Sequence, residues 1–174
     1  THEKSALVIR QLRLSGLTWR DGTEIIQNPG TGFVENLDNL PYPSRDLIDN
    51  TLYRRPDTNE VQTTIVTSRG CPFHCTFCLS RVVSGSKIRS RSVADIIGEL
   101  KECVNKYHIK SFLFRSDTFT ADKAWLTELC HQIKTELPGI SWACNSRVDL
   151  FNEDIAKKMK DAGCWLIAFG IESG

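Results

Sequence analysis

The sequence predicts an α/β fold in which parallel strands alternate with helices, as in the first part of a (β/α) barrel. Two observations lead to this prediction. From Val61 onward, short apolar segments alternate with longer segments whose apolar residues recur at helical spacing. Alternation of elements of these lengths is typical of a parallel sheet with right-handed crossovers. Cysteine-rich or polar stretches follow the strand segments, where α/β proteins place their functional groups.

Four strand segments are expected between residues 61 and 174. They read VQTTIVTS, SFLF, ISWAC and WLIAFGI. Four strands make half of a complete (β/α)8 barrel or the first part of a partial barrel. A sheet that ended at its fourth strand would leave an unpaired hydrophobic edge, so we expect further strands or a partner to cover that edge.

Three helices are expected between these strands. The first starts after Ser92, with Asp95 placed as in a capping box, and has apolar positions at Val93, Ile96, Ile97, Leu100 and Val104. The second is capped by Thr120 and has an apolar face of Trp125, Leu126, Leu129, Ile133 and Leu137. The third starts at Asn152 and is stopped by Gly163.

Residues 1–60 differ from the rest and are predicted to form a hairpin and a linker ahead of the α/β segment, residues 61–174. Asp21-Gly22 lies between GLTWR and TEIIQ, which is a short-hairpin signal. The stretches NPGTG and NLPYPSRD are rich in Pro, Gly and Asn, which favours an extended linker over a surface. Ser44 is expected to cap one short helix through Leu47–Leu52.

Charge and hydropathy exclude some classes of protein. The chain has 22 basic and 21 acidic side chains. With a net charge this close to zero, the chain as a whole does not attract nucleic acid or an anionic membrane electrostatically. It has no N-terminal apolar signal region, and its longest apolar run, CWLIAFGI, is far below the ~18–20 residues of a membrane span. We therefore expect a cytoplasmic protein. Because the chain begins at Thr1 and stops after a strand-like segment, we also expect it to be part of a longer polypeptide.

The seven cysteines fall into two groups. Four of them are scattered within apolar patterns and are expected to be buried free thiols: Cys103, Cys130, Cys144 and Cys164. An odd number cannot pair completely within one chain, and the spacing does not resemble a secreted disulfide framework. A reducing compartment fits this pattern better.

The other three cysteines lie within eight residues in TSRGCPFHCTFCL, directly after the first strand segment. A structural zinc site would take Cys71, Cys75, Cys78 and His74, but this spacing is cramped for a closed tetrahedral site. A thiol redox pair would use Cys75 and Cys78, although such a motif normally opens a helix. An iron–sulfur cluster would use all three thiolates and leave one iron open to a ligand that is not protein.

The pattern Cys-x3-Cys-x2-Cys followed by (β/α) repeats resembles the radical S-adenosylmethionine (radical SAM) superfamily, over roughly residues 61–174. The resemblance implies that Cys71, Cys75 and Cys78 hold a 4Fe-4S cluster whose fourth iron is chelated by S-adenosylmethionine. It implies reductive cleavage to a 5′-deoxyadenosyl radical that abstracts hydrogen from a small-molecule substrate. It also implies an electron donor such as flavodoxin or ferredoxin.

Further residues at the strand ends match positions where this family contacts S-adenosylmethionine: Phe77, Ser116, Asp117, Ser146, Arg147, Glu172 and Ser173. Phe77 matches the aromatic residue near the adenine, or else anchors the loop. Ser116 and Asp117 stand where the family binds the amino group, although its Gly-Gly-Glu stretch is absent here and Asp117 could instead cap a helix.

The last two strand ends complete this set. Ser146 and Arg147 are candidates for ribose or carboxylate contacts, with a structural ion pair as the alternative for Arg147. Glu172 and Ser173 resemble the ribose-contacting positions, with a solvated turn as the alternative for Glu172. A run of basic residues between the cysteines and the first helix is either solvated or faces an anionic ligand: Arg81, Lys87, Arg89 and Arg91.

The segment before the cysteines favours one branch of the superfamily. ENLDNLPYPSRDL and the preceding Trp19–Gly22 hairpin resemble radical enzymes that carry an upstream cobalamin-binding domain, among them methyltransferases and oxidative cyclases. The resemblance implies cobalamin in the full-length protein, held mainly by a part outside this chain, since Asp-x-His-x2-Gly is absent. Two alternatives stay open: a tRNA methylthiotransferase-like enzyme, and an iron–sulfur binding or electron-transfer module without catalysis.

Overall fold

The computed structural model describes residues 14–172, and contacts divide the chain into two units, residues 1–34 and 35–174. In the first unit, β1 (Thr18–Asp21) pairs antiparallel with β2 (Glu24–Gln27). The two-residue loop is Gly22-Thr23, and Gly22 has a φ of 61°, which glycine adopts without steric cost. The predicted hairpin is therefore confirmed.

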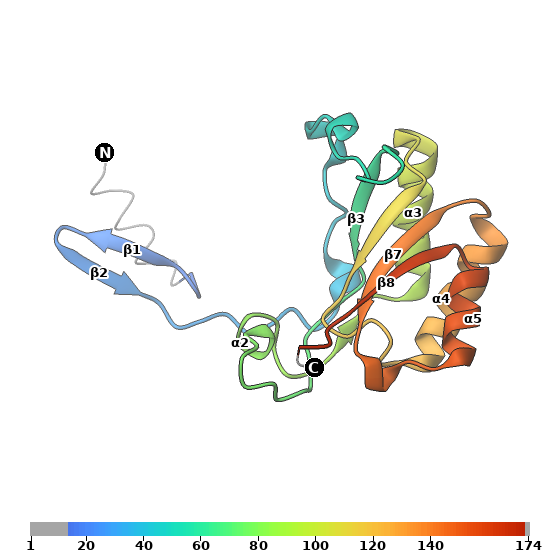
Figure 1. Ribbon diagram of the computed structural model, residues 1–174. Helices are drawn as coiled ribbons and strands as arrows, with labels where there is room; N and C mark the ends of the chain where they lie inside the picture. Colours follow the sequence, from blue (N-terminus) through green and yellow to red (C-terminus); the bar gives the residue numbers. More distant parts are fainter. Residues whose placement is uncertain (1–13, 173–174) are drawn as a thin grey trace. The chain divides into compact units, whose positions relative to one another are not determined.

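The second unit is built on a parallel sheet whose strands stand in the order β3 (Gln62–Val66), β6 (Ser111–Arg115), β7 (Ser141–Ser146) and β8 (Cys164–Phe169). One face of the sheet is covered by the helices α3 (Val93–Tyr107), α4 (Lys123–Glu136) and α5 (Glu153–Asp161) (Figure 1). The predicted α/β class, with four parallel strands and three crossover helices, is confirmed.

Successive side chains of each strand point to opposite faces of the sheet, and one of these faces forms the core with the helices. Ile65, Phe112, Phe114 and Trp142 are fully buried with the helices. The rings of Phe114 and Trp142 stack at 4.8 Å, and Trp142 Nε1 donates to the carbonyl of Ala162 at 2.8 Å. Burying each such side chain contributes about 1.5–3 kcal/mol before the entropic cost of ordering it.

Two of the predicted helix starts are confirmed, and one is wrong. Ser92 Oγ accepts from the backbone N–H of Asp95 at 3.1 Å, and Asn152 Oδ1 accepts from the N–H of Ile155 at 2.9 Å. For α4, however, the cap is Asp122, because Thr120 is fully buried and its hydroxyl is engaged elsewhere. The helix therefore begins at Lys123.

The expected short helix after Ser44 is also wrong. The chain forms two separate 3₁₀ turns, η2 (Arg45–Leu47) and η3 (Asn50–Leu52), and the Ser44 side chain makes no capping hydrogen bond. The backbone between them is extended at Ile48, which interrupts any continuous helix. Further short elements were not predicted: η1 (Leu37–Asn39), η4 (Val148–Leu150), α2 (Ser80–Ser84), β4 (Ser68–Arg69) and β5 (Arg89–Ser90).

The outer edge of β3 is closed by arginine side chains. Arg45 Nη2 donates to the carbonyl of Thr64 at 3.1 Å, and Arg91 Nη1 donates to the carbonyl of Val66 at 3.0 Å. These carbonyls point away from β6, where a neighbouring strand would otherwise pair. Residues 35–60 thus pack with the β/α segment and cover its first strand.

Both arginines meet at one buried carboxylate. Glu99 on α3 is only 1% exposed, and it accepts from Arg45 at 2.5 Å and from Arg91. Arg91 also pairs with Asp95 at 2.6 Å. Several hydrogen bonds satisfy each charge, which is the condition under which a buried ion group is tolerated.

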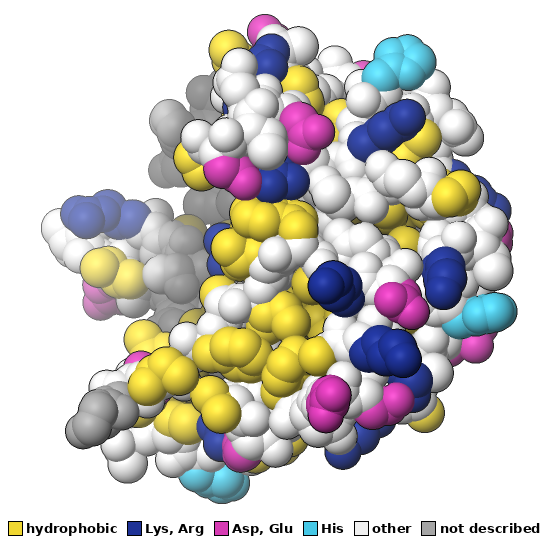
Figure 2. Space-filling view, turned by 45° about the vertical axis from the view of Figure 1, so that its right-hand side comes forward, with side chains coloured by type: hydrophobic (Ala, Val, Ile, Leu, Met, Phe, Trp, Pro, Cys, Tyr) yellow, Lys and Arg dark blue, Asp and Glu magenta, His cyan; other side chains and the backbone are white. Residues whose placement is uncertain are grey.

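The opposite edge of the sheet is β8, beyond which no strand pairs within residues 14–172. Trp165 and Leu166 stay more than two-fifths exposed there, as the predicted hydrophobic edge requires. Figure 2 shows hydrophobic side chains gathered in a patch on the face of the molecule turned toward the viewer. No described helix is both long and apolar enough to span a lipid bilayer.

We expect Glu99→Gln to lower the free energy of unfolding by about 3–5 kcal/mol, because it leaves two buried guanidinium groups without their shared counter-charge. Glu102→Gln is the matched control on the same helix, where the carboxylate is partly exposed and lies 3.6 Å from Lys106. Its cost should stay below about 1 kcal/mol. Urea unfolding of both variants measures the difference, and equal losses would contradict the role given to Glu99.

Candidate functional site

The cysteine-rich loop leaves the carboxyl end of β3 and returns through a short ladder. β4 pairs antiparallel with β5, which closes the loop at its base. Gly70 has a φ of 95°, and a Cβ atom there would lie 2.0 Å from the carbonyl oxygen of Lys87. The N–H of Cys71 donates to the carbonyl of Gly85 at 3.0 Å. Only glycine allows the two arms of the loop to approach this closely.

The three cysteines of the loop differ in exposure. Cys71 is buried, Cys75 is half-buried and Cys78 is exposed, and all are free thiols. The N–H of Cys78 donates to the carbonyl of Cys75 at 3.1 Å, and the N–H of Ser80 lies 3.4 Å from Cys78 Sγ. Within residues 14–172, no three His, Cys, Asp or Glu side chains are grouped so that they could hold a metal ion. The thiols therefore share one loop without meeting at one point.

Three of the four scattered cysteines are buried, as predicted, and the fourth is not. Cys103, Cys130 and Cys144 are buried, and Cys164 is half-buried. Burial raises the pKa of Cys103 to about 11 and that of Cys130 to about 12. A hydrogen bond with Cys164, together with burial, raises the pKa of Cys144. These three thiols stay protonated at neutral pH and are poor metal ligands.

A cavity of about 400 Å³ lies beside the loop at the carboxyl ends of β3, β6 and β7. Its wall includes Cys71 and Cys78 together with polar groups from the next two strand ends, Ser116, Asp117 and Asn145. This is the edge of a parallel α/β sheet where ligand sites are found. The structure thus brings two of the three cysteines and two predicted polar residues to one cavity.

Hydrogen bonds hold the polar wall of this cavity in place. Asp117 Oδ2 accepts from the N–H of Gly70 at 2.8 Å, which ties the end of β6 to the start of the cysteine loop. Asn145 Nδ2 donates to the carbonyl of Ser116 at 2.8 Å. The hydroxyl of Ser116 lies 2.6 Å from that of Ser68. Asn145 and Ser68 were not predicted from the sequence, although both lie at strand ends.

Ser146, which was predicted as a contact residue, does not line this cavity. Its hydroxyl is buried and lies 2.5 Å from the hydroxyl of Thr120. Successive side chains of a strand point to opposite faces, so Asn145 faces the cavity while Ser146 faces the helices. The alternation that buries Trp142 and Cys144 is the sequence signal that places Ser146 on the helix-facing side.

Arg147 connects the end of β7 to the cysteine loop. Its guanidinium lies 3.9 Å from the ring centre of Phe73, and its Nη1 lies 3.6 Å from Cys75 Sγ. It also binds both carboxylate oxygens of Asp149, at 3.0 and 2.8 Å. This pairing lowers the pKa of Asp149 and raises the pKa of Arg147.

The other predicted residues lie apart from the cavity. Glu172 lines a separate hollow with Arg147 and Gly170, and its φ is 64°. Phe77 is 68% exposed on the loop. Ser173 lies outside the described residues.

The basic run of the loop is not a free cationic surface. Arg91 is buried in the ion group around Glu99, and the guanidinium of Arg89 donates to the carbonyl of Ser84 at 2.5 Å. Arg81 lies 2.6 Å from His74 Nδ1, and Lys87 pairs with Glu35 at 3.1 Å. The expectation of a solvated or ligand-facing run is wrong for Arg89 and Arg91, whose side chains support the loop.

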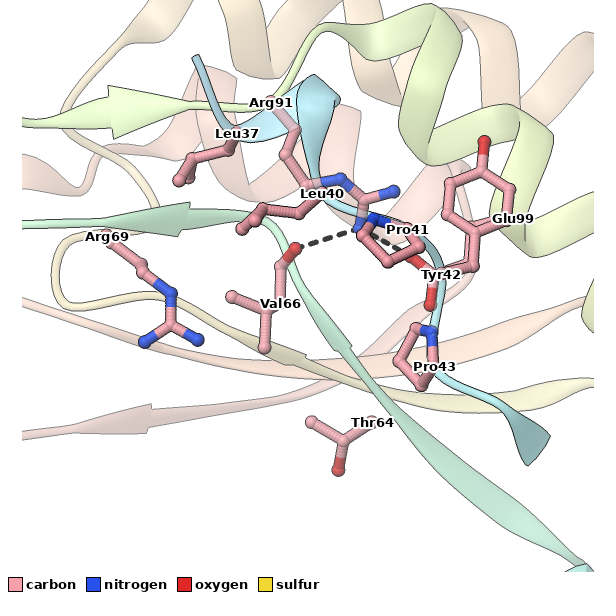
Figure 3. A pocket seen from close by; sticks show the side chains of 10 residues that line it. All are labelled: Leu37, Leu40, Pro41, Tyr42, Pro43, Thr64, Val66, Arg69, Arg91 and Glu99. Atoms are coloured by element: carbon pink, nitrogen blue, oxygen red, sulfur yellow. Dashed lines mark hydrogen bonds and ion pairs between the residues drawn. The ribbon is translucent and has the colours of Figure 1, made fainter. Parts of the chain in front are cut away.

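Two arginines that the sequence did not single out line the cavity instead. Arg69 and Arg115 stand at the ends of β4 and β6, and both side chains are exposed. Arg69 also lines a neighbouring apolar pocket of about 150 Å³, together with Leu37, Leu40 and Pro41 (Figure 3). The apolar pocket and the cysteine-lined cavity therefore adjoin at Arg69.

Comparison with known proteins gives one family and several relatives. The family described as the Radical SAM superfamily matches residues 65–174. An uncharacterized methyltransferase of Pyrococcus horikoshii is 38% identical over 165 residues, which cover 94% of this chain and 36% of that protein. Cytidylyl-2-hydroxyethylphosphonate methyltransferase of Streptomyces wedmorensis is 30% identical over 156 residues, which cover 84% of this chain and 29% of that protein.

A solved structure supports the fold. The cobalamin-dependent S-adenosylmethionine radical enzyme OxsB, with aqua-cobalamin and S-adenosylmethionine bound, aligns with a TM-score of 0.70 at 20% identity. The alignment covers 98% of this chain and 27% of that one. The chain thus spans only about a third of the length of the proteins it matches.

We expect Gly70→Ala to destabilise the protein more than Gly139→Ala does. Both glycines have φ near +90°, so both variants incur a backbone strain of about 1–2 kcal/mol. Only at Gly70 does the added methyl group meet a backbone carbonyl, whereas nothing lies within 4 Å at Gly139. The extra loss should be about 1–3 kcal/mol in urea unfolding. Equal losses would show that the loop base tolerates a side chain.

Proposed function

This chain belongs to the radical SAM superfamily, and on that premise we propose that the full-length protein cleaves S-adenosylmethionine reductively with an iron–sulfur cluster held by Cys71, Cys75 and Cys78. The observation that carries the proposal is the placement of three thiols in one loop at the carboxyl end of β3, with Cys71 and Cys78 in the wall of a cavity. Thiolates are the usual ligands of iron–sulfur clusters.

The donor set fits such a cluster better than it fits zinc. A closed zinc site needs a fourth protein ligand, and the loop offers only His74. His74 Nδ1 accepts from the guanidinium of Arg81, which cannot give up its proton, so that ring nitrogen is already engaged. Three thiolates without a fourth protein ligand suit a 4Fe-4S cluster, which when bound supplies an electron and an open iron position for S-adenosylmethionine.

Polar groups of the cavity are placed to bind the amino acid part of S-adenosylmethionine. Asp117 uses Oδ2 to accept from Gly70, and its other carboxylate oxygen has no hydrogen bond within the described residues. That oxygen is available to accept from an ammonium group, which is a charge-assisted hydrogen bond. Ser116 and Asn145 extend the same polar wall.

Arg147 is proposed to act on the cluster site rather than on the ribose. Its guanidinium lies 3.6 Å from Cys75 Sγ, so a cluster bound by Cys75 would have this positive charge beside one of its sulfur ligands. Phe73 and Asp149 hold the guanidinium from the other sides.

The relatives named as methyltransferases support cobalamin-dependent methyl transfer as the activity of the full-length protein. Residues 61–174 would form the N-terminal part of its radical SAM core, and residues 1–60 the hairpin and linker that follow a cobalamin-binding domain. Cobalamin itself would be held mainly by a part outside this chain. We further propose a cytoplasmic protein that receives electrons from a flavodoxin or ferredoxin and acts on a small-molecule substrate.

We expect Cys71→Ala, Cys75→Ala and Cys78→Ala each to abolish cluster assembly, because each removes one of three ligands. Cys130→Ala is the matched control, since that thiol is buried in the core. Anaerobic reconstitution with iron and sulfide, followed by iron analysis and visible absorbance, measures the difference. Zinc without iron in the reconstituted protein would overturn the proposal.

Asp117→Asn should weaken S-adenosylmethionine binding about tenfold or more while iron content stays unchanged, because the amide lacks the negative charge that pairs with an ammonium group. Asp122→Asn is the control, since asparagine caps a helix as well as aspartate does. Equilibrium binding of S-adenosylmethionine to the reconstituted protein tests this. Unchanged affinity in Asp117→Asn would remove Asp117 from the site.

A further inference from the structure

Arg69 and Arg115 differ from the other arginines that surround the sheet. Arg45, Arg55 and Arg91 are buried, and each pairs with at least one carboxylate. The guanidinium groups of Arg69 and Arg115 have neither a hydrogen bond nor an ion pair within residues 14–172, and both line the cavity that holds Cys71 and Cys78. The carboxylate in that wall, Asp117, is tied to the backbone of Gly70.

The charge of the wall therefore suits an anionic group. The lining contains two guanidinium groups and one carboxylate, and the carboxylate forms an ion pair with neither of them. A guanidinium presents paired N–H donors that match the two oxygens of a carboxylate or phosphate. An oxyanion bound there would lie in the same cavity as the cysteine thiols.

The pocket on the other side of Arg69 is chemically different. Figure 3 shows Arg69 at one end of this pocket and Pro41 and Pro43 at the other. Leu37, Leu40 and Val66 also belong to its apolar lining. Arg91 and Glu99 in its wall form an ion pair with each other, so neither side chain needs a polar ligand as a partner.

The size of the pocket limits what enters it. Its volume of about 150 Å³ is close to that of an apolar cavity known to hold a single benzene ring. A bound molecule would place one ring, or a short branched chain, in the pocket. Its acidic group would then reach Arg69 at the shared boundary with the cavity.

We propose that Arg69 and Arg115 form an oxyanion subsite for the substrate, and that the adjoining apolar pocket receives a ring-sized apolar group of the same molecule. The substrate class is thus an amphiphilic acid, a carboxylate or phosphate next to a small apolar moiety. This inference rests on the proposed function, because it assigns the ligand to the cavity beside the cluster loop.

The test uses the reconstituted full-length protein and three probes: phenyl phosphate, inorganic phosphate and phenol. Calorimetric titration should show phenyl phosphate binding more tightly than either fragment. Arg69→Gln and Arg115→Gln should each weaken phenyl phosphate about tenfold or more. Arg20→Gln, an exposed arginine of the β1–β2 hairpin, is the matched control and should leave the affinity unchanged.

A fourth variant tests the apolar pocket. Leu40→Trp adds a large apolar group at the pocket wall without altering charge, and by competing for the pocket it should reduce the advantage of phenyl phosphate over inorganic phosphate. Equal binding of the two phosphates by the unsubstituted protein would overturn the apolar half of the proposal. Unchanged phenyl phosphate affinity in both arginine variants would overturn the oxyanion half.

Iron content and S-adenosylmethionine affinity are measured on every variant, because the carboxylate of S-adenosylmethionine is a second source of the same anion. If the arginine variants lose S-adenosylmethionine and keep phenyl phosphate, the two guanidinium groups serve the cofactor and the substrate proposal is overturned. Loss of the probe with normal iron and cofactor binding supports the proposal. An unsubstituted protein that takes up no iron contradicts the proposed function itself, independently of the probe.

Discussion

The buried carboxylate of Glu99 is the constraint on which the candidate site depends. It receives Arg45 from the linker and Arg91 from the segment that leads into α3, and the same two guanidinium groups bind the carbonyls of Thr64 and Val66. One side chain therefore fixes the strand that enters the cysteine loop and the segment that leaves it. Removing these three charges from water is costly, so the group is stable only as a complete set.

The cysteine loop combines a fixed base with an open tip. Gly70 and the β4–β5 ladder hold the two arms together, and Asp117 ties the base to the next strand. The tip carries Cys78 and the exposed side chains of Phe77 and Leu79. If the loop holds a cluster as proposed, its tip would have to move to bring the three thiols together, while its base is tied to the end of β6 through Asp117.

The elements with long, regular patterns could be predicted from the sequence, and the short or long-range ones could not. Periodicity located the four strands and three helices because burial on one face repeats along each element. The cap of α4 was misplaced because Thr120 is drawn into the core by a hydroxyl contact with Ser146, which no local pattern encodes. The cysteines were singled out by their spacing and Asp117 by the family resemblance, and Cys71, Cys78 and Asp117 do line one cavity. Arg69 lines the same cavity but was not singled out, because an isolated arginine has no sequence signature.

The two edges of the sheet are not equivalent, and this asymmetry has a consequence for assembly during synthesis. On the outer side of β3 the carbonyls of Thr64 and Val66 are already bound by guanidinium groups, whereas no strand within residues 14–172 pairs with the outer side of β8. Because a nascent chain emerges with its N-terminal part first, Arg45, Arg91 and Glu99, which close the β3 edge, leave the ribosome before β8 does. The edge that is open to pairing with another chain thus belongs to the last of the four described strands to be synthesised.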